Sequence, residues 1–272
     1  MEIQTGIWGA AFKWCRCLSF SIRLTQFFWN NTYDFKYAGL VFLLVLISYR
    51  HLALYAIVMM LGAFCWFVGN GIWLLGLPIY KVIIWWIGFL VLTIAGERLE
   101  LSRILHLSKE NKLIFILAVS VFIIGALLAI KIFGIGVRIA SIGMIVLALW
   151  LLRNDIARRT IHKSGLSRFM AVSLLLGYIW LVKSGILGLL FEGTTAGFYY
   201  DAILHSIFVG FVFSMIFPHA PIIFPTVMGL PKLLPFQSWF YVHLTLLHLS
   251  AVFTDNRRPI TVTTRASVGR II

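Results

Sequence analysis

Charged side chains are scarce in this sequence, at 12% of 272 residues, and only nine of them are Asp or Glu. Globular domains carry about 25% charged residues, so the chain lacks the polar surface of a soluble enzyme. Its three cysteines are too few for a disulfide-stapled scaffold. Intrinsic disorder is excluded because 61% of the residues are hydrophobic. The sequence also lacks a P-loop, which argues against a nucleotide-driven pump. A multi-pass membrane protein is the class that remains.

The basic residues are the larger charged group and give the chain a net charge of +14. They lie in short segments between apolar runs and form no continuous patch. This pattern is typical of cytoplasmic loops that meet anionic lipid headgroups. We therefore expect the lipid bilayer as a partner and no nucleic acid, and other membrane subunits remain possible partners.

Apolar runs divide the chain into membrane spans, because a bilayer core of about 30 Å requires about 20 apolar residues in a helix. A shorter run of 13 residues, Tyr37–Tyr49, is either re-entrant or part of an eighth span. The sequence thus predicts an all-α fold, a multi-pass transmembrane helical bundle with seven or eight spans. Its predicted organisation is an N-terminal basic and aromatic segment over 1–35, a transmembrane domain over 36–254 and a polar basic tail over 255–272. The seven clear runs are Leu52–Leu77, Ile79–Ala95, Leu113–Phe133, Ile139–Leu152, Phe169–Phe191, Ile203–Phe217 with an apolar extension to Val227, and Trp239–Phe253.

Loop charge predicts the orientation of the bundle. The segments 97–112 and 153–168 are rich in Lys and Arg, whereas the segment 191–201 has Glu192 and Asp201 but no basic residue. By the positive-inside rule the two basic segments lie inside and the acidic one outside. We expect an integral membrane protein of the bacterial inner (cell) membrane. The rule places the arginine-rich tail after Asp255 on the outer side, which is unusual for basic residues.

Histidines are the main chemical signal, since four of the seven fall in the last two predicted spans: His205, His219, His243 and His248. Ionisable side chains inside a membrane are costly and mark functional sites by default, although a histidine can also simply hydrogen-bond to a neighbouring helix. On an α-helix, residues 14 apart share a face but lie about 21 Å apart, so His205 and His219 cannot hold one ion together. We expect pairs across the two spans instead, His219 with His243 and His205 with His248.

Two imidazoles on facing helices are the axial ligands that a six-coordinate haem requires. The sequence therefore predicts haem b at the four histidines, with copper as a second possible metal. A tight tetrahedral zinc or copper cage is less favoured because no Cys, Asp or Glu accompanies the histidines within these spans.

Prolines concentrate between the same two spans, where Pro218, Pro221 and Pro225 are followed by Pro231 and Pro235. A proline inside a helix removes a backbone hydrogen bond and clashes with the preceding turn, so Pro218 is expected to end or kink its helix. Irregular backbone at membrane depth is tolerated only when it is buried in protein or faces a cavity. The proline segment is thus either a packed turn or the lining of a site.

The block from His205 to Gly229, with Pro218-His219-Ala220-Pro221 in its middle, resembles a haem-ligating helix of subunit I of haem-copper oxidases. It is also similar to the NnrS family of haem- and copper-containing membrane proteins associated with nitric oxide stress. The resemblance implies a redox or nitric-oxide-response role, with His205 as first haem-ligand candidate. Because those families have about 12 spans, it also implies a truncated chain. The loss of apolar periodicity after Phe253 and the arginine-rich tail predict further apolar runs encoded after Thr254 in another reading frame.

Two alternatives to a haem protein stay open. One is a transporter or permease-like protein in which the proline-broken helix lines the substrate path. The other is a structural membrane protein without a ligand. The sequence makes no commitment to an enzyme and predicts no catalytic residues. Four charged residues at the end of the second span, Glu97, Arg98, Glu100 and Arg103, are interpreted as a solvated face at the membrane boundary.

Overall fold

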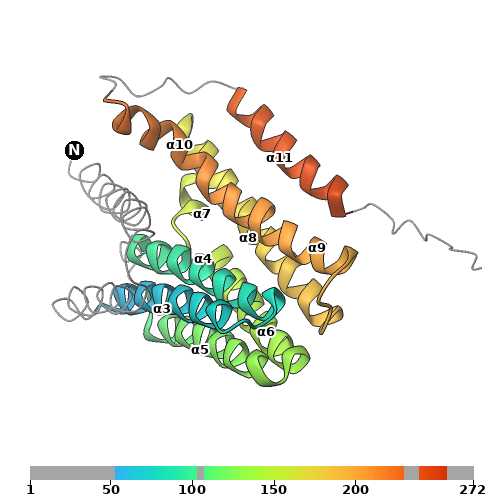
Figure 1. The fold of residues 1–272 in the computed structure, drawn as a ribbon. Coiled ribbons are helices and arrows are strands. Elements are labelled where there is room, and N and C mark those ends of the chain that lie inside the picture. Colours follow the sequence, from blue (N-terminus) through green and yellow to red (C-terminus); the bar gives the residue numbers. More distant parts are fainter. Residues whose placement is uncertain (1–52, 103–106, 230–238, 256–272) are drawn as a thin grey trace, which may run out of the picture.

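Every regular element of the chain is helical over the residues that the computed structural model describes, 53–102, 107–229 and 239–255. Figure 1 shows long helices that lie beside one another and run across the view, as expected for a membrane bundle. In chain order the elements are α3 (Leu54–Leu74), α4 (Ile79–Leu101), α5 (Lys109–Lys131), α6 (Phe133–Asn154), α7 (Ala157–Thr160), α8 (Leu166–Leu190), α9 (Phe198–His205), the π-helix η2 (Ser206–Val212), α10 (Phe213–Val227) and α11 (Trp239–Asp255).

Six helices of the described chain are long and apolar enough to cross a membrane, so an all-α integral membrane protein in contact with lipid is confirmed. These are α3, α4, α5, α6, α8 and the continuous helix Phe198–Ile223. The expected seventh span corresponds to α11, which is apolar but shorter. The possible eighth span, Tyr37–Tyr49, lies outside the described residues, as do the segment 1–35 and nearly all of the tail 255–272.

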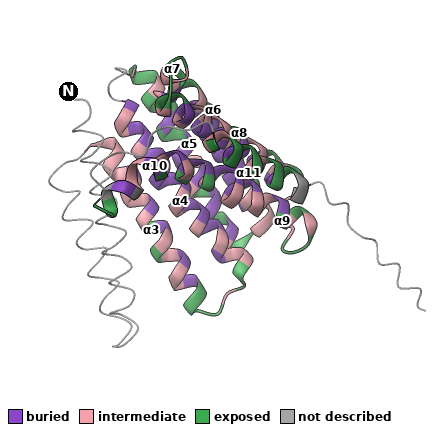
Figure 2. Cartoon of the chain, turned by 90° about the horizontal axis from the view of Figure 1, so that it is seen from above, coloured by how far each residue is buried: buried purple, intermediate pink, exposed green. Residues whose placement is uncertain are grey.

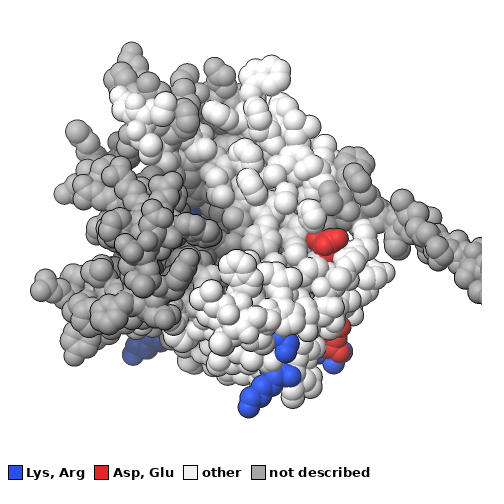
Figure 3. Space-filling view, in the orientation of Figure 1, with Lys and Arg blue, Asp and Glu red and all other residues white. Residues whose placement is uncertain are grey.

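Apolar side chains cover the outside of the bundle as well as its core. The face in Figure 3 is largely uncharged, and the charged side chains visible there lie along the lower and right edges. On α5, Leu117, Ile124 and Leu127 are each more than half exposed. Buried residues gather where the helices meet (Figure 2). An apolar exterior of this kind is stable in lipid and not in water.

The helices form two groups. The hairpins α3–α4 and α5–α6 make the first group, and α8, α9, η2 and α10 make the second, with α6 packed against α8 between them. The helix α11 packs against α9, η2 and α8. Following the predicted orientation, the end that carries the 155–165 loop is called the inner end, and the end that carries the 191–197 loop is called the outer end.

Small residues allow α5 and α6 to approach backbone to backbone. A Cβ atom on Gly136 would lie 2.2 Å from the backbone nitrogen of Ala129, and a Cβ on Gly125 would lie 2.2 Å from that of Ala140. Close approach over small residues is a main source of helix association in lipid, because lipid provides no hydrophobic driving force between helices. The α5–α6 hairpin is therefore a tightly fitted unit.

Of the two expectations for Pro218, an end or a kink of the helix, the first is wrong, because α10 continues through Pro218, Pro221 and Pro225 to Val227. Helices in membranes tolerate proline when side chains and local π-helical turns satisfy the freed backbone groups. Here the π-helix η2 directly precedes α10.

Replacing Gly136 by alanine should separate α5 from α6, because the new methyl group would overlap the Ala129 backbone. Overpacking costs about 1–3 kcal/mol, which corresponds to a fall of roughly 3–10 °C in the thermal midpoint of the purified protein. Gly134→Ala is the matched control on the same helix, since its Cβ would have no neighbour closer than 4.0 Å. Equal midpoints for the two variants would contradict this packing.

Candidate functional site

A cluster of ionisable and polar side chains is buried at the inner end of the bundle. It consists of Glu97 and Arg98 near the end of α4, Asp155 directly after α6, Tyr178 on α8 and His219 on α10, and is called the Arg98 cluster. Arg98 is only 4% exposed and Asp155 only 2%. Charges this deep are costly unless they are paired, so their presence marks the site as functionally interesting.

Arg98 joins two helices that belong to different groups. Its Nη2 donates to Glu97 Oε1 at 2.7 Å on its own helix and contacts His219 Nε2 at 3.1 Å on α10. The guanidinium therefore connects α4 to α10, while its buried Nε–H has no acceptor among the described residues.

The hydrogen bonds of His219 define its tautomer. A guanidinium can only donate, so His219 Nε2 must accept and carries no proton. His219 Nδ1 lies 2.5 Å from the Met215 carbonyl oxygen, which can only accept, so Nδ1 carries the proton. His219 is therefore a neutral imidazole whose two nitrogens are both engaged.

Asp155 and Tyr178 form the second half of the Arg98 cluster. The Tyr178 hydroxyl donates to one Asp155 carboxylate oxygen, and the backbone N–H of Ala157 donates to the other at 2.8 Å. These bonds fasten the turn after α6 to α8. Both residues are close enough to act electrostatically on Arg98. The cluster thus places two carboxyl groups, a tyrosine and a neutral histidine around one guanidinium.

The four predicted site histidines lie in different surroundings. Only His219 belongs to the Arg98 cluster. His205 has its Nδ1 2.7 Å from the Asp201 carbonyl oxygen, and the exposed His243 has its Nδ1 2.8 Å from that of Trp239. His219 contacts Arg98, and its expected pairing with His243 stays a prediction.

His248 is held by an indole. Trp180 Nε1–H donates to His248 Nδ1 at 2.7 Å, and the two rings are nearly parallel, with centroids 6.1 Å apart. Because an N–H bond of this kind lies in the ring plane, the rings are arranged edge to edge rather than face to face. The acceptor role of Nδ1 leaves the proton on Nε2, which is buried without a partner among the described residues.

Within the described ranges, no group of three or more His, Cys, Asp or Glu side chains could hold a metal ion. Haem b and copper bound by His205, His219, His243 and His248 remain predictions.

Sequence reasoning missed much of the Arg98 cluster. The interpretation of Glu97 and Arg98 as a solvated face is wrong for Arg98, which is buried because α10 covers it. Asp155 and Tyr178 were not singled out. One signal was available, because Asp155 is the single acidic residue in the otherwise basic segment 153–168.

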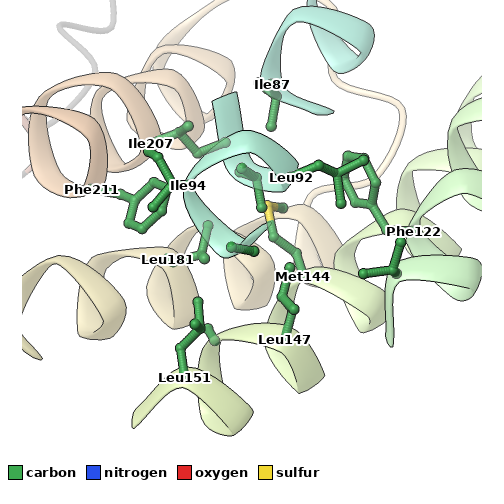
Figure 4. Close-up of a cluster of buried hydrophobic side chains, with 14 of the residues drawn as sticks. Ile87, Leu92, Ile94, Phe122, Met144, Leu147, Leu151, Leu181, Ile207 and Phe211 are labelled. Atoms are coloured by element: carbon green, nitrogen blue, oxygen red, sulfur yellow. The ribbon is translucent and has the colours of Figure 1, made fainter. Parts of the chain in front are cut away.

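A cavity of about 60 Å³ lies at the other end of the bundle, between α4, α5 and α6 on one side and α8, α9 and η2 on the other. Its lining is almost entirely apolar. Buried apolar side chains, among them Leu92, Ile94, Leu181 and Phe211, fill the core of the bundle (Figure 4). Since Ile94 and Phe211 come from α4 and η2, the core side chains meet across the two groups of helices.

Residues 21–254 match the family described as a domain of unknown function, DUF8744. The chain belongs to this family. The match includes all five members of the Arg98 cluster, which is therefore part of the DUF8744 region. No curated protein and no solved structure matches the chain. Homology to NnrS proteins or to haem-copper oxidases is not among the findings, so that resemblance stays a hypothesis.

Replacing Tyr178 by phenylalanine should destabilise the protein, because a buried Asp155 oxygen would lose its hydroxyl donor. An unsatisfied buried polar group costs about 1–3 kcal/mol, and more when it is charged. Tyr199→Phe is the control, since Tyr199 is 43% exposed and its ring contacts do not need the hydroxyl. Thermal midpoints of the detergent-purified variants test this, and a Tyr178→Phe variant as stable as the control would contradict the role of the bond.

Proposed function

We propose that this integral membrane protein is a transporter that works by alternating access, with the Arg98 cluster as its inner gate. The observation that carries the proposal is the contact of Arg98 with His219, which ties α4 to α10 at the inner end. At the outer end a cavity separates the same two groups of helices. A bundle that is closed by polar contacts on one side and hollow on the other has the shape of one state in an alternating-access cycle.

The helix that carries His219 is suited to movement. It begins with α9, passes through the π-helix η2 and contains three prolines, Pro218, Pro221 and Pro225. Such interruptions lack part of the regular backbone ladder, and they occur frequently at functional sites and hinges. This supports the earlier alternative in which the proline-containing helix lines the substrate path. By contrast, α5 and α6 are fitted so closely that they are expected to move as one body.

Protons offer a way to couple the gate to an ion gradient. If a proton bound to His219 Nε2, this atom would become a donor facing the guanidinium of Arg98, and the hydrogen bond between them would be lost. Because the guanidinium of Arg98 faces the same nitrogen, the added proton is disfavoured while the contact is closed, so protonation of His219 and its separation from Arg98 would occur together. Opening of the inner gate would thus accompany protonation of His219.

Cysteine accessibility tests the gate without knowledge of the substrate. The three cysteines of the chain are first replaced by serine: Cys15, Cys17 and Cys65. A single cysteine is then introduced in place of Leu181, a fully buried core residue on the outer side of the gate. In inside-out vesicles we expect a membrane-impermeant maleimide to label this cysteine at least tenfold faster when His219→Leu is added.

His243→Leu serves as the matched control, because His243 is exposed and outside the Arg98 cluster. A cysteine at the exposed loop position His162 reports the orientation of the vesicles and should label equally in all variants. Unchanged labelling of Leu181→Cys in the His219→Leu background would rule out the gate.

Haem binding is a second candidate function, favoured by the hydrogen bonds of two histidines. Histidines that bind a metal through Nε2 usually hold Nδ1–H against a carbonyl or carboxylate. His205 and His243 have this arrangement, so both fit an axial haem ligand. His219 and His248 fit less well, because Arg98 contacts Nε2 of the first and Trp180 donates to Nδ1 of the second. A redox or nitric-oxide-response role belongs to this candidate.

An absorption spectrum of the full chain, purified from haem-supplied cells, tests the second candidate. Six-coordinate haem b would give a Soret band and sharp α and β bands on reduction, and His205→Ala would abolish them. His162→Ala, in an exposed loop, should leave the spectrum unchanged. A colourless wild-type protein would contradict haem binding.

Location in a bacterial inner membrane and association with other membrane subunits are further parts of the proposal.

A further inference from the structure

We infer that the outer cavity binds the apolar part of an uncharged amphipathic molecule, and that such molecules are the substrate class of the transporter. The identification as substrate rests on the proposed function, whereas the binding itself does not. The inference draws on the depth of the cavity, the chemistry of its wall and the chemistry of its mouth.

The cavity extends inward from the outer end along three helices. On α4 its lining runs from Tyr80 to Ile87, on α6 from Phe133 to Met144, and along α9 and η2 from Tyr200 to Ile207. These stretches correspond to about 10 Å along α4 and along α9 and η2, and to about 16 Å along α6. All three walls therefore extend over about 10 Å or more, so the cavity is deeper than a shallow surface depression. It is called the slot below.

The wall of the slot is apolar. Ile83, Ile84, Phe122 and Leu204 contribute to it, and no charged side chain is part of the lining. Apolar cavities stay dry and take up apolar molecules, because water finds no hydrogen-bonding partners in them. At about 60 Å³ the space exceeds several times what one water molecule needs, so it is large enough for the end of an aliphatic chain.

The mouth of the slot is bordered by residues that carry hydroxyl groups and offers no unbalanced charge. Tyr80, Thr194 and Tyr200 belong to the lining at the outer end, and the Thr194 hydroxyl donates to the Phe191 carbonyl oxygen at 2.7 Å. Next to the lining, Arg138 on α6 and Glu192 after α8 form an ion pair with each other. Hydroxyls can donate to and accept from an uncharged polar group, whereas a charged headgroup would have to compete with an existing ion pair. An uncharged headgroup therefore suits this mouth better than a charged one.

Photolabelling of the full chain in lipid nanodiscs tests the site, with octanol that carries a diazirine on its chain as the probe. We expect label on the lining positions Ile83, Ile87 and Met144, and competition by unlabelled octanol. Ile203→Phe and, from the opposite wall, Val137→Phe fill the slot and should each reduce this labelling at least fivefold. Both positions are only partly buried, so the larger ring can be accommodated without unfolding.

Ile186→Phe is the matched control, because Ile186 is 45% exposed and lies outside the lining. It should change labelling of the slot by less than twofold. The inference is overturned if label falls only on exposed positions of the bundle, or if both slot-filling variants are labelled like wild type. His219→Leu should keep the label, since binding in the slot does not depend on the gate. Loss of photolabelling and loss of gated cysteine accessibility thus report separately on the slot and on the proposed function.

Discussion

A guanidinium enclosed in an apolar bundle cannot be left without partners, and this constraint organises the inner end of the protein. Arg98 reaches its partners only if the end of α4 lies beside α10, and Asp155 and Tyr178 bring the end of α6 and α8 to the same place. Four helices thus meet at one polar centre. In a low-dielectric environment the attraction between these charges is strong, and so is the penalty for separating them.

The two ends of the bundle differ in how the two groups of helices contact each other. At the inner end, hydrogen bonds hold the two groups of helices together. At the outer end, the same groups enclose a slot, and an ion pair between Arg138 and Glu192 spans its border. Between them lies a core of interlocking aliphatic and aromatic side chains (Figure 4). Movement at one end therefore requires the core to rearrange, whereas the α5–α6 hairpin can remain rigid.

The sequence predicted the membrane spans well because span length and apolar composition follow directly from bilayer thickness. It could not predict the Arg98 cluster, since its members come from four separate helices and each one has an ordinary local explanation. Arg98 looks like a boundary residue until α10 covers it, and Asp155 looks like part of a loop. For the histidines the sequence predicted too much. Four of them cluster along the chain, but among the described residues only His219 belongs to the Arg98 cluster.

The π-helix η2 has a consequence for the angular phase of the helix that follows it. A residue added to a helical turn rotates everything beyond it by about 100° and advances it by about 1.5 Å. The expectation that His205 and His219 share one face assumed uninterrupted α-helix between them, and η2 occupies half of that interval. Conversion of η2 into regular α-helix would rotate α10 about its own axis and shift it along that axis. His219 would then leave Arg98 by rotation, without any need for α10 to tilt away from α4.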